Sequence, residues 1–327
     1  MIKRSLHKAI SFEPVLGHMR GSRLDEKVVV LMYHEIAEDS DEIEAWTVVR
    51  KSDFIRQMEY LSVHFDMLSM EEALERMSPG HKDSQRPGAL VTFDDGYSGN
   101  NRVLLPIVRS MNLPVTVFVA TRAVKEGSLY WYDRIINALQ GGVPITLDLK
   151  RLALGNYRIN RYRGAENWRE IERLLRDLKA LEPQARAAAV EAILGELGPS
   201  KAKPCSLGPM THEELAEISG CPLMTIGAHS HCHNILTQLS GEDIRESVET
   251  SRELLEEWTG CRMRYFSYPN GNFDDGVVDI IRGLGFECAV TTVSRPWSKE
   301  DPVFTIPRIG VGRYDSFESF KIKVSGG

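Results

Sequence analysis

Short apolar runs alternate along the chain with longer stretches whose apolar residues recur at helical spacing. The short runs lie at residues 27–32, 89–93, 114–120 and 223–226. They are rich in small and β-branched residues, a composition typical of buried parallel strands. In one of the longer stretches, residues 52–64, the apolar positions fall on a single helical face. This alternation predicts an α/β fold with a parallel sheet and right-handed crossover helices.

The alternation is interrupted between residues 125 and 210. A short β-like run at 145–149 is followed there by two amphipathic stretches, 168–178 and 188–197, with no buried strand between them. We therefore predict that residues 125–210 form an inserted, mainly helical cap. An aromatic cluster at 129–132 fits either packing in the core or stacking on a sugar ring.

The cap divides a single larger unit. We predict that residues 27–327 form one barrel-type domain, and that residues 1–26, which show no clear period, form an N-terminal arm. A chain of 327 residues with 42% hydrophobic residues can bury a core of this size.

Charge and composition exclude several classes of function. The net charge is −6 and the basic residues are dispersed, which argues against nucleic acid and against an anionic membrane surface as partners. No stretch reaches the ~18 apolar residues of a transmembrane helix, and no secretory apolar region follows the N-terminus, so we expect a cytoplasmic protein. The five cysteines lack paired CxxC spacing, which favours free thiols over a disulfide framework or a zinc ribbon.

Titratable residues follow three of the predicted strands. His34 follows the first run, Asp94 and Asp95 follow the second, and three histidines lie within residues 229–233 after the last. The carboxyl ends of parallel strands are where α/β folds place their sites, so we expect these side chains to meet. Two adjacent carboxylates repel each other unless a cation, a shared proton or an arginine compensates them.

The histidine-rich stretch allows two arrangements. In a helix or tight coil, His229 and His233 can converge on one ion, whereas in an extended stretch His231 would share their face. Each signal also has a structural explanation, since Asp-Gly is common turn chemistry and His34 could be a core histidine. As a set, an Asp-His-His group with a second Asp and a further His is typical of metal-assisted hydrolysis.

Three motifs carry a family resemblance. The segments Thr92–Tyr97, Gly227–His233 and Tyr268–Gly271 resemble the motifs of the polysaccharide deacetylases, the NodB-homology group or carbohydrate esterase family four. The likeness extends over roughly residues 27–325. It implies a distorted (β/α) barrel of the NodB-homology type and a metal-dependent hydrolase that removes acetyl groups from an N-acetylated sugar or polysaccharide, with an N-acetylated glycan as its partner.

The resemblance also implies residue roles. Asp94 would be the general base, and Asp95, His229 and His233 would be the ligands of a divalent metal, most simply Zn²⁺, with Co²⁺ or another divalent ion as alternatives. His231 falls outside the family pattern.

The third motif implies contacts to the substrate. Its turn can present the backbone N–H of Asn270 to an oxyanion. Tyr97 and Tyr268 would lie beside the substrate.

Two departures from the family pattern concern the base and the acid. The arginine that usually opens the third motif is Ser267 here, and no histidine follows His233 to act as a late general acid. The sequence Tyr33-His34-Glu35 and the acidic run after it resemble the poly-N-acetylglucosamine deacetylase branch, which assigns the acid role to His34. Arg308, in a last strand expected at 304–309, is the candidate to replace the arginine.

Residue types alone do not name the acyl group. A hydrolase of the same fold that acts on another amide or on a formyl group is therefore an alternative. So is an inactive, carbohydrate-binding relative, in view of the missing arginine and late histidine.

Overall fold

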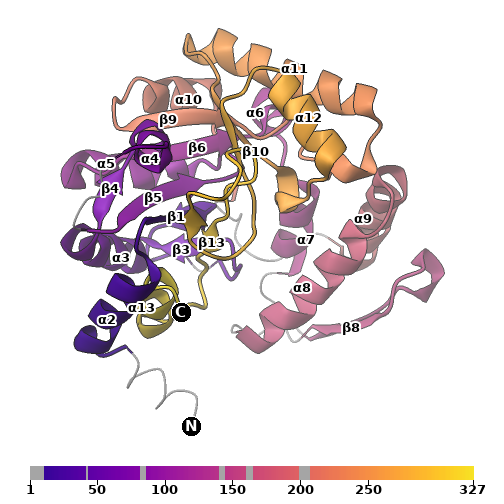
Figure 1. The fold of residues 1–327 in the computed structure, drawn as a ribbon. Coiled ribbons are helices and arrows are strands. Elements are labelled where there is room, and N and C mark those ends of the chain that lie inside the picture. Colours follow the sequence, from indigo (N-terminus) through magenta and orange to yellow (C-terminus); the bar gives the residue numbers. More distant parts are fainter. Residues whose placement is uncertain (1–10, 42, 82–85, 140–143, 160–164, 199–206) are drawn as a thin grey trace.

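A curved, mainly parallel sheet forms the centre of the computed structural model, which describes residues 11–41, 43–81, 86–139, 144–159, 165–198 and 207–327 (Figure 1). The strands of this sheet are β1 (Lys27–Tyr33), β4 (Asp66–Leu68), β5 (Gly88–Phe93), β6 (Val115–Val119), β9 (Met224–Ala228), β10 (Tyr265–Ser267), β11 (Cys288–Val290), β12 (Trp297–Ser298) and β13 (Ile309–Gly310). Their order is β11-β10-β9-β6-β5-β1-β12, with β4 also paired to β5 and β13 to β1. All pairs are parallel except β1–β12. The predicted α/β class and distorted barrel are confirmed.

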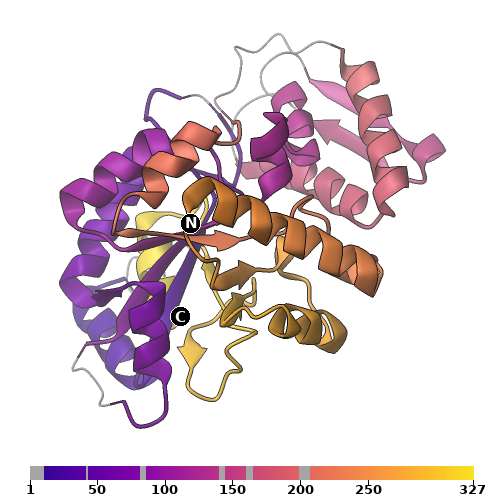
Figure 2. The same cartoon turned by 90° about the horizontal axis from the view of Figure 1, so that it is seen from above.

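Helices follow the strands in the predicted alternation and surround the sheet (Figures 1 and 2). They are α2 (Glu13–Arg23), α3 (Lys51–His64), α4 (Met70–Met77), α5 (Leu105–Met111), α6 (Thr121–Glu126), α10 (His212–Ser219), α11 (Gly241–Thr259), α12 (Asp275–Gly283) and α13 (Phe317–Val324). Short pieces complete the barrel: a π-helix at Asn100–Leu104, 3₁₀ turns at Leu236–Gln238 and Pro269–Gly271, and the strand pair β2 (Glu35–Ala37) and β3 (Val48–Arg50).

Local capping signals set where several helices begin. Ser69 and Glu72 form a complete capping box at the start of α4, and Thr211 and Glu214 form another at α10. The Ser240 hydroxyl accepts from the third backbone N–H of α11. These side chains satisfy N–H groups that have no partner within the helix.

Alternate residues of the central strands face opposite sides of the sheet. Val29 and Val91 pack in a core shared with the surrounding helices, whereas Val28 and Leu90 pack in a separate core inside the barrel. Because side chains alternate along a strand, Asp94 continues the inward-facing series that begins at Leu90. The strand pattern therefore directs this carboxylate toward the barrel axis.

The insertion forms a second packed unit beside the barrel (Figure 2). Its elements are α7 (Trp131–Leu139), the antiparallel pair β7 (Ile145–Asp148) and β8 (Asn156–Ile159), a 3₁₀ turn at Lys150–Leu152, α8 (Ala165–Lys179) and α9 (Pro183–Leu197). Ile171, Leu174 and Leu178 of α8 pack with Val190 and Ile193 of α9 in a hydrophobic core that also takes in a few barrel residues.

Three further observations concern the ends and composition of the chain. Part of the expected arm is helix α2, which lies beside α13 (Figure 1), and Arg20 donates to the hydroxyl of Tyr60 at 2.6 Å. The last strand is shorter than the expected 304–309, because Pro307 cannot donate a ladder hydrogen bond. The four cysteines in the described ranges are free, and no helix within those ranges is long and apolar enough to span a membrane.

Candidate metal centre and active site

The turn after β5 presents two carboxylates in different directions. Asp95 has φ of 77° and Gly96 has φ of 75°, both in the left-handed region that non-glycine residues rarely adopt. A Cβ at Gly96 would approach the side chain of Val119 to 2.8 Å, so the turn requires glycine for space as well. With this strained backbone, the carboxylate of Asp95 contacts His229 directly after β9, whereas that of Asp94 contacts Arg308.

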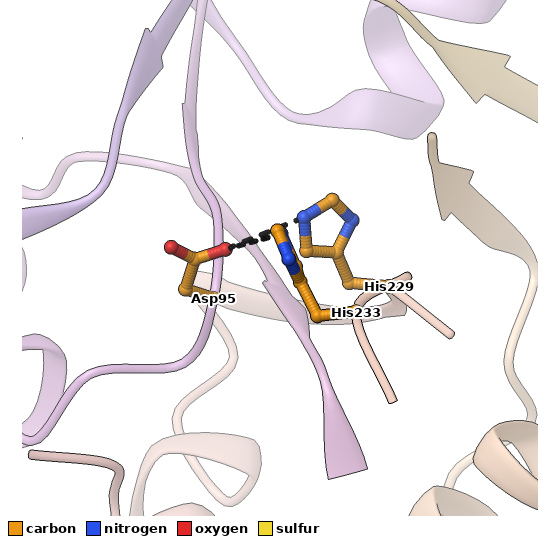
Figure 3. A group of neighbouring side chains, drawn as sticks. All are labelled: Asp95, His229 and His233. Carbon is orange, nitrogen blue, oxygen red and sulfur yellow. Dashed lines mark ion pairs between the residues drawn. The ribbon is translucent and has the colours of Figure 1, made fainter. Parts of the chain in front are cut away.

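Asp95, His229 and His233 form a compact group with the geometry of a metal centre (Figure 3). Oδ1 of Asp95 lies 3.4 Å from Nε2 of His229 and 3.1 Å from Nε2 of His233. Ligand atoms about 2.1 Å from a tetrahedral ion lie roughly 3.4 Å apart. Oδ1 of Asp95 is also buried and has no hydrogen-bond partner among the described residues. The donor set and spacing therefore fit a divalent ion held by three protein ligands.

Neighbouring groups orient these three side chains. The carbonyl of Ser267 lies 2.7 Å from Nδ1 of His229, which places the proton on Nδ1 and leaves the Nε2 lone pair free. The hydroxyl of Tyr132 donates to Oδ2 of Asp95 at 2.9 Å, so Oδ1 is the oxygen that faces the histidines. Burial acts to raise the pKa of Asp95, but His233 and His229 hold it well below its usual range.

His231 is not part of the group. Its Nδ1 lies 2.9 Å from Oγ1 of Thr121 at the start of α6. His233 has φ of 53°, so the chain turns tightly after His231 and brings His233 back toward His229. Of the two arrangements that the sequence allowed, the structure adopts the coiled one.

Asp94 forms a buried two-point ion pair with Arg308. The guanidinium donates from Nη1 to Oδ1 at 2.8 Å and from Nη2 to Oδ2 at 2.6 Å. Arg308 is completely buried, and its remaining donors reach the hydroxyls of Thr92 and Ser267 and the carbonyl of Thr291. Burial acts to raise the pKa of Asp94, but Arg308 outweighs it and the pKa is lowered.

This ion pair bears on the departure in the third motif. Ser267 stands at the position where the family motif has an arginine, and its hydroxyl accepts from Arg308. The third motif of this chain supplies no arginine to the carboxylate of Asp94. Arg308, from the C-terminal part of the chain, supplies the cation instead.

His34 lies in the same pocket as both aspartates. This pocket of about 470 Å³ is lined by His34, Trp46, Asp94, Asp95 and the two histidines of the metal group, among others. The His34 ring packs edge-on against Trp46, and its Nδ1 is buried without a partner in the described chain. Burial lowers the pKa of His34, while Asp95 and Asp94 oppose that shift.

Of the remaining predicted site residues, one lines the pocket and two lie outside it. Asn270 lines the pocket, with φ of 58° in the turn after β10. The hydroxyl of Tyr97 instead donates to Asp133 under the cap, and that of Tyr268 donates to the carbonyl of Phe304. Both tyrosines are completely buried and neither lines the pocket, so a direct substrate contact is not supported for them.

Several pocket residues were missed by the sequence analysis. One wall of the pocket is formed by Trp168, Glu172, Leu175, Arg176 and Lys179 of α8. They are spaced by four, three, one and three residues, which places them on one helical face. That spacing was readable in the sequence, but it does not reveal which neighbour the face meets.

The fold and this site define an α/β barrel protein with an Asp-His-His metal centre beside an arginine-paired carboxylate. Residues 81–289 match the polysaccharide deacetylase family, and the chain belongs to that family. This confirms the family predicted from the three motifs.

The individual relatives that match this chain share only a small part of its sequence. A Bacillus subtilis protein, "Putative polysaccharide deacetylase YxkH", is 25% identical over 120 residues, which cover 36% of this chain and 41% of that protein. The match thus spans less than half of that curated relative. The solved structure of Streptococcus pyogenes deacetylase PplD in complex with acetate has a TM-score of 0.61 at 18% identity, covering 91% of this chain and 98% of that one. IcaB from Ammonifex degensii has a TM-score of 0.57 at 18% identity, covering 92% and 97%.

Proposed function

We propose that the protein is a metal-dependent N-deacetylase that hydrolyses the acetamido group of an N-acetylated sugar or polysaccharide. One observation carries the proposal: the Asp95–His229–His233 group, the arginine-paired Asp94 and His34 open into one pocket. Hydrolysis of an amide needs an electrophilic activator, a base and an acid within reach of one carbonyl. The pocket brings residues of all three kinds together.

The metal would be held by Asp95, His229 and His233. A divalent ion at this position supplies Lewis acidity for the acyl carbonyl and lowers the pKa of a water molecule. The same donor set accepts Zn²⁺, Co²⁺ and other divalent ions.

Asp94 is the proposed general base. It stays ionised because Arg308 lowers its pKa, and it lines the pocket. Its carboxylate accepts a proton from the water that attacks the acyl carbon. We assign to the backbone N–H of Asn270, a residue that lines the pocket, the role of donor to the resulting oxyanion.

His34 is the proposed general acid. When the C–N bond breaks, the leaving nitrogen takes a proton and the products are acetate and a free amine on the sugar. A proton donated from the His34 ring completes this step. Glu35 does not compete for the role, because its carboxylate is buried and accepts from the backbone N–H groups of Ile36 and Gly99.

The pocket walls support a sugar as substrate. Trp46 and Trp168 both line the cavity, and aromatic rings offer the apolar faces on which pyranose rings stack. The Tyr33-His34-Glu35 segment, with His34 in the pocket, supports the poly-N-acetylglucosamine deacetylase branch within the family.

The test is acetate release from N-acetylglucosamine oligomers by the purified protein. The protein is stripped of metal, then restored with zinc or cobalt, and Asp94→Asn serves as the blank. We expect release that depends on metal and is abolished in the variant. Formylated oligomers are assayed in parallel. Release of formate alone would reassign the acyl group, and no release from either substrate despite one bound ion per chain would refute the proposed activity.

A further inference from the structure

Lys179, the last residue of α8, reaches the pocket from the cap. It lines the same cavity as Asp95 and His233, and its ammonium donates to Oδ1 of Asn270 at 2.7 Å. The backbone carbonyl of Lys179 accepts from the side chain of Gln238 at 3.0 Å, which ties this end of the helix to the loop after β9. The lysine is therefore held in place between the cap and the barrel.

Among the residues that the structure describes, Lys179 forms no ion pair with a carboxylate, and its hydrogen-bond acceptor is the neutral amide of Asn270. Burial lowers the pKa of Lys179, with Asp95 and Glu172 acting in the opposite direction. A partly buried cation that faces an open cavity with only a neutral partner is stabilised when an anion enters that cavity.

We propose that Lys179 is an anion-binding residue of the substrate pocket and that it takes a carboxylate. This inference rests on the proposed function, because that function makes the ligand of the pocket an N-acetylated glycan. The carboxylate has two chemical sources: a uronate carried by an acidic N-acetylated glycan, or the acetate that the reaction releases. The overall charge of −6 does not favour anions, so their recognition must be local.

The other charged residues of the wall are less suited to this role. Arg176 is exposed at the pocket and lies 3.7 Å from the carboxylate of its neighbour Asp177. Glu172 carries the wrong sign and lies two helical turns before Lys179, a rise of roughly 10 Å along the axis. The anion-binding end of the wall is therefore the end next to Asn270.

The experiment measures binding, so it does not depend on turnover. Three probes are titrated into metal-free protein: a tetrasaccharide of alternating N-acetylglucosamine and glucuronate, a neutral N-acetylglucosamine tetramer, and sodium acetate. Acetate is also titrated into the zinc-restored protein. Calorimetry reports the sugars and saturation-transfer NMR reports acetate. The variants are Lys179→Met and Lys179→Arg, with Arg169→Met as the matched control on an exposed part of α8 outside the pocket.

For a uronate, we expect the wild type to bind the acidic tetrasaccharide about tenfold more tightly than the neutral one, as one charge-assisted contact predicts. Lys179→Met should remove this preference, while Lys179→Arg retains part of it. For acetate as the source, both sugars bind alike in all variants and Lys179→Met weakens acetate alone. The proposal is overturned if Lys179→Met binds every probe as the wild type does, or if Arg169→Met produces the same loss. Failure of deacetylation with a preserved Lys179 effect would count against the proposed function only.

Discussion

Replacement of Arg308 by methionine tests the buried ion pair on which the active site depends. The substitution keeps an unbranched side chain but removes five hydrogen bonds, two of them to Asp94. The side chains of Arg308 and Asp94 are 0% and 4% exposed, so water cannot solvate the Asp94 carboxylate when the guanidinium is removed. Removing one partner of a buried pair typically costs about 3–5 kcal/mol of folding free energy. We expect a loss of that size, together with a higher pKa of Asp94, because burial is then no longer opposed by the guanidinium.

The assay is urea unfolding of metal-free protein at pH 7, which removes any contribution from metal binding. The double variant Asp94→Asn with Arg308→Met should be more stable than the sum of the single losses predicts, because it leaves no unpaired charge. The control is Arg134→Met, which breaks a pair with Glu191 whose side chains are 39% and 63% exposed. Such pairs contribute about 0–1 kcal/mol. If Arg308→Met cost no more than this control, the argument that Arg308 holds Asp94 as a buried carboxylate would be wrong.

Three further predictions follow from the site and its surroundings. After reconstitution, metal analysis should find zinc in the wild type and in His231→Ala but not in Asp95→Asn; retention in Asp95→Asn would contradict the ligand assignment. His34→Ala should keep bound zinc and lose acetate release, and near wild-type turnover would exclude it as the acid. Burial raises the pKa of Asp133 well above its usual range, with the Tyr97 hydroxyl opposing and Asp95 adding to the shift. At a pH above the ordinary pKa range of a carboxyl group, Asp133 is then protonated in the folded state and ionised in the unfolded chain. Stability therefore falls with rising pH, by up to about 1.4 kcal/mol per unit, until the raised pKa is passed. Asp133→Asn should remove that slope, so its stability relative to the wild type should rise from pH 5.5 to pH 8 in urea unfolding; a constant difference would show that Asp133 is ionised when folded.

The barrel and the metal group were predictable because their signals are local. The apolar runs are short and three of the four end in titratable residues, so the parallel sheet alone brings Asp95 and the histidines to one edge. The choice between His231 and His233 required the backbone, because the left-handed residues Ser230 and His233 decide which ring turns toward His229.

Long-range packing explains what the sequence could not specify. Arg308 pairs with a residue 214 positions away, and this contact exists because β13 lies next to β1 and β1 lies next to β5. No local pattern encodes that adjacency. Tyr97 was placed near the substrate by its motif, yet the positive φ at Gly96 turns the chain so that Tyr97 packs under the cap.

In the cap, too, the sequence did not specify which neighbour a helix face would meet. The periodic apolar residues of the cap predicted the helix α8, but they did not show that the face with Trp168 and Lys179 would border the pocket. In the structure the barrel strands supply the proposed base and metal ligands, whereas the inserted helix supplies much of the wall that a glycan would contact. Substitutions of the wall residues on α8 should therefore change which sugars bind without removing a metal ligand, because Asp95, His229 and His233 all belong to the barrel.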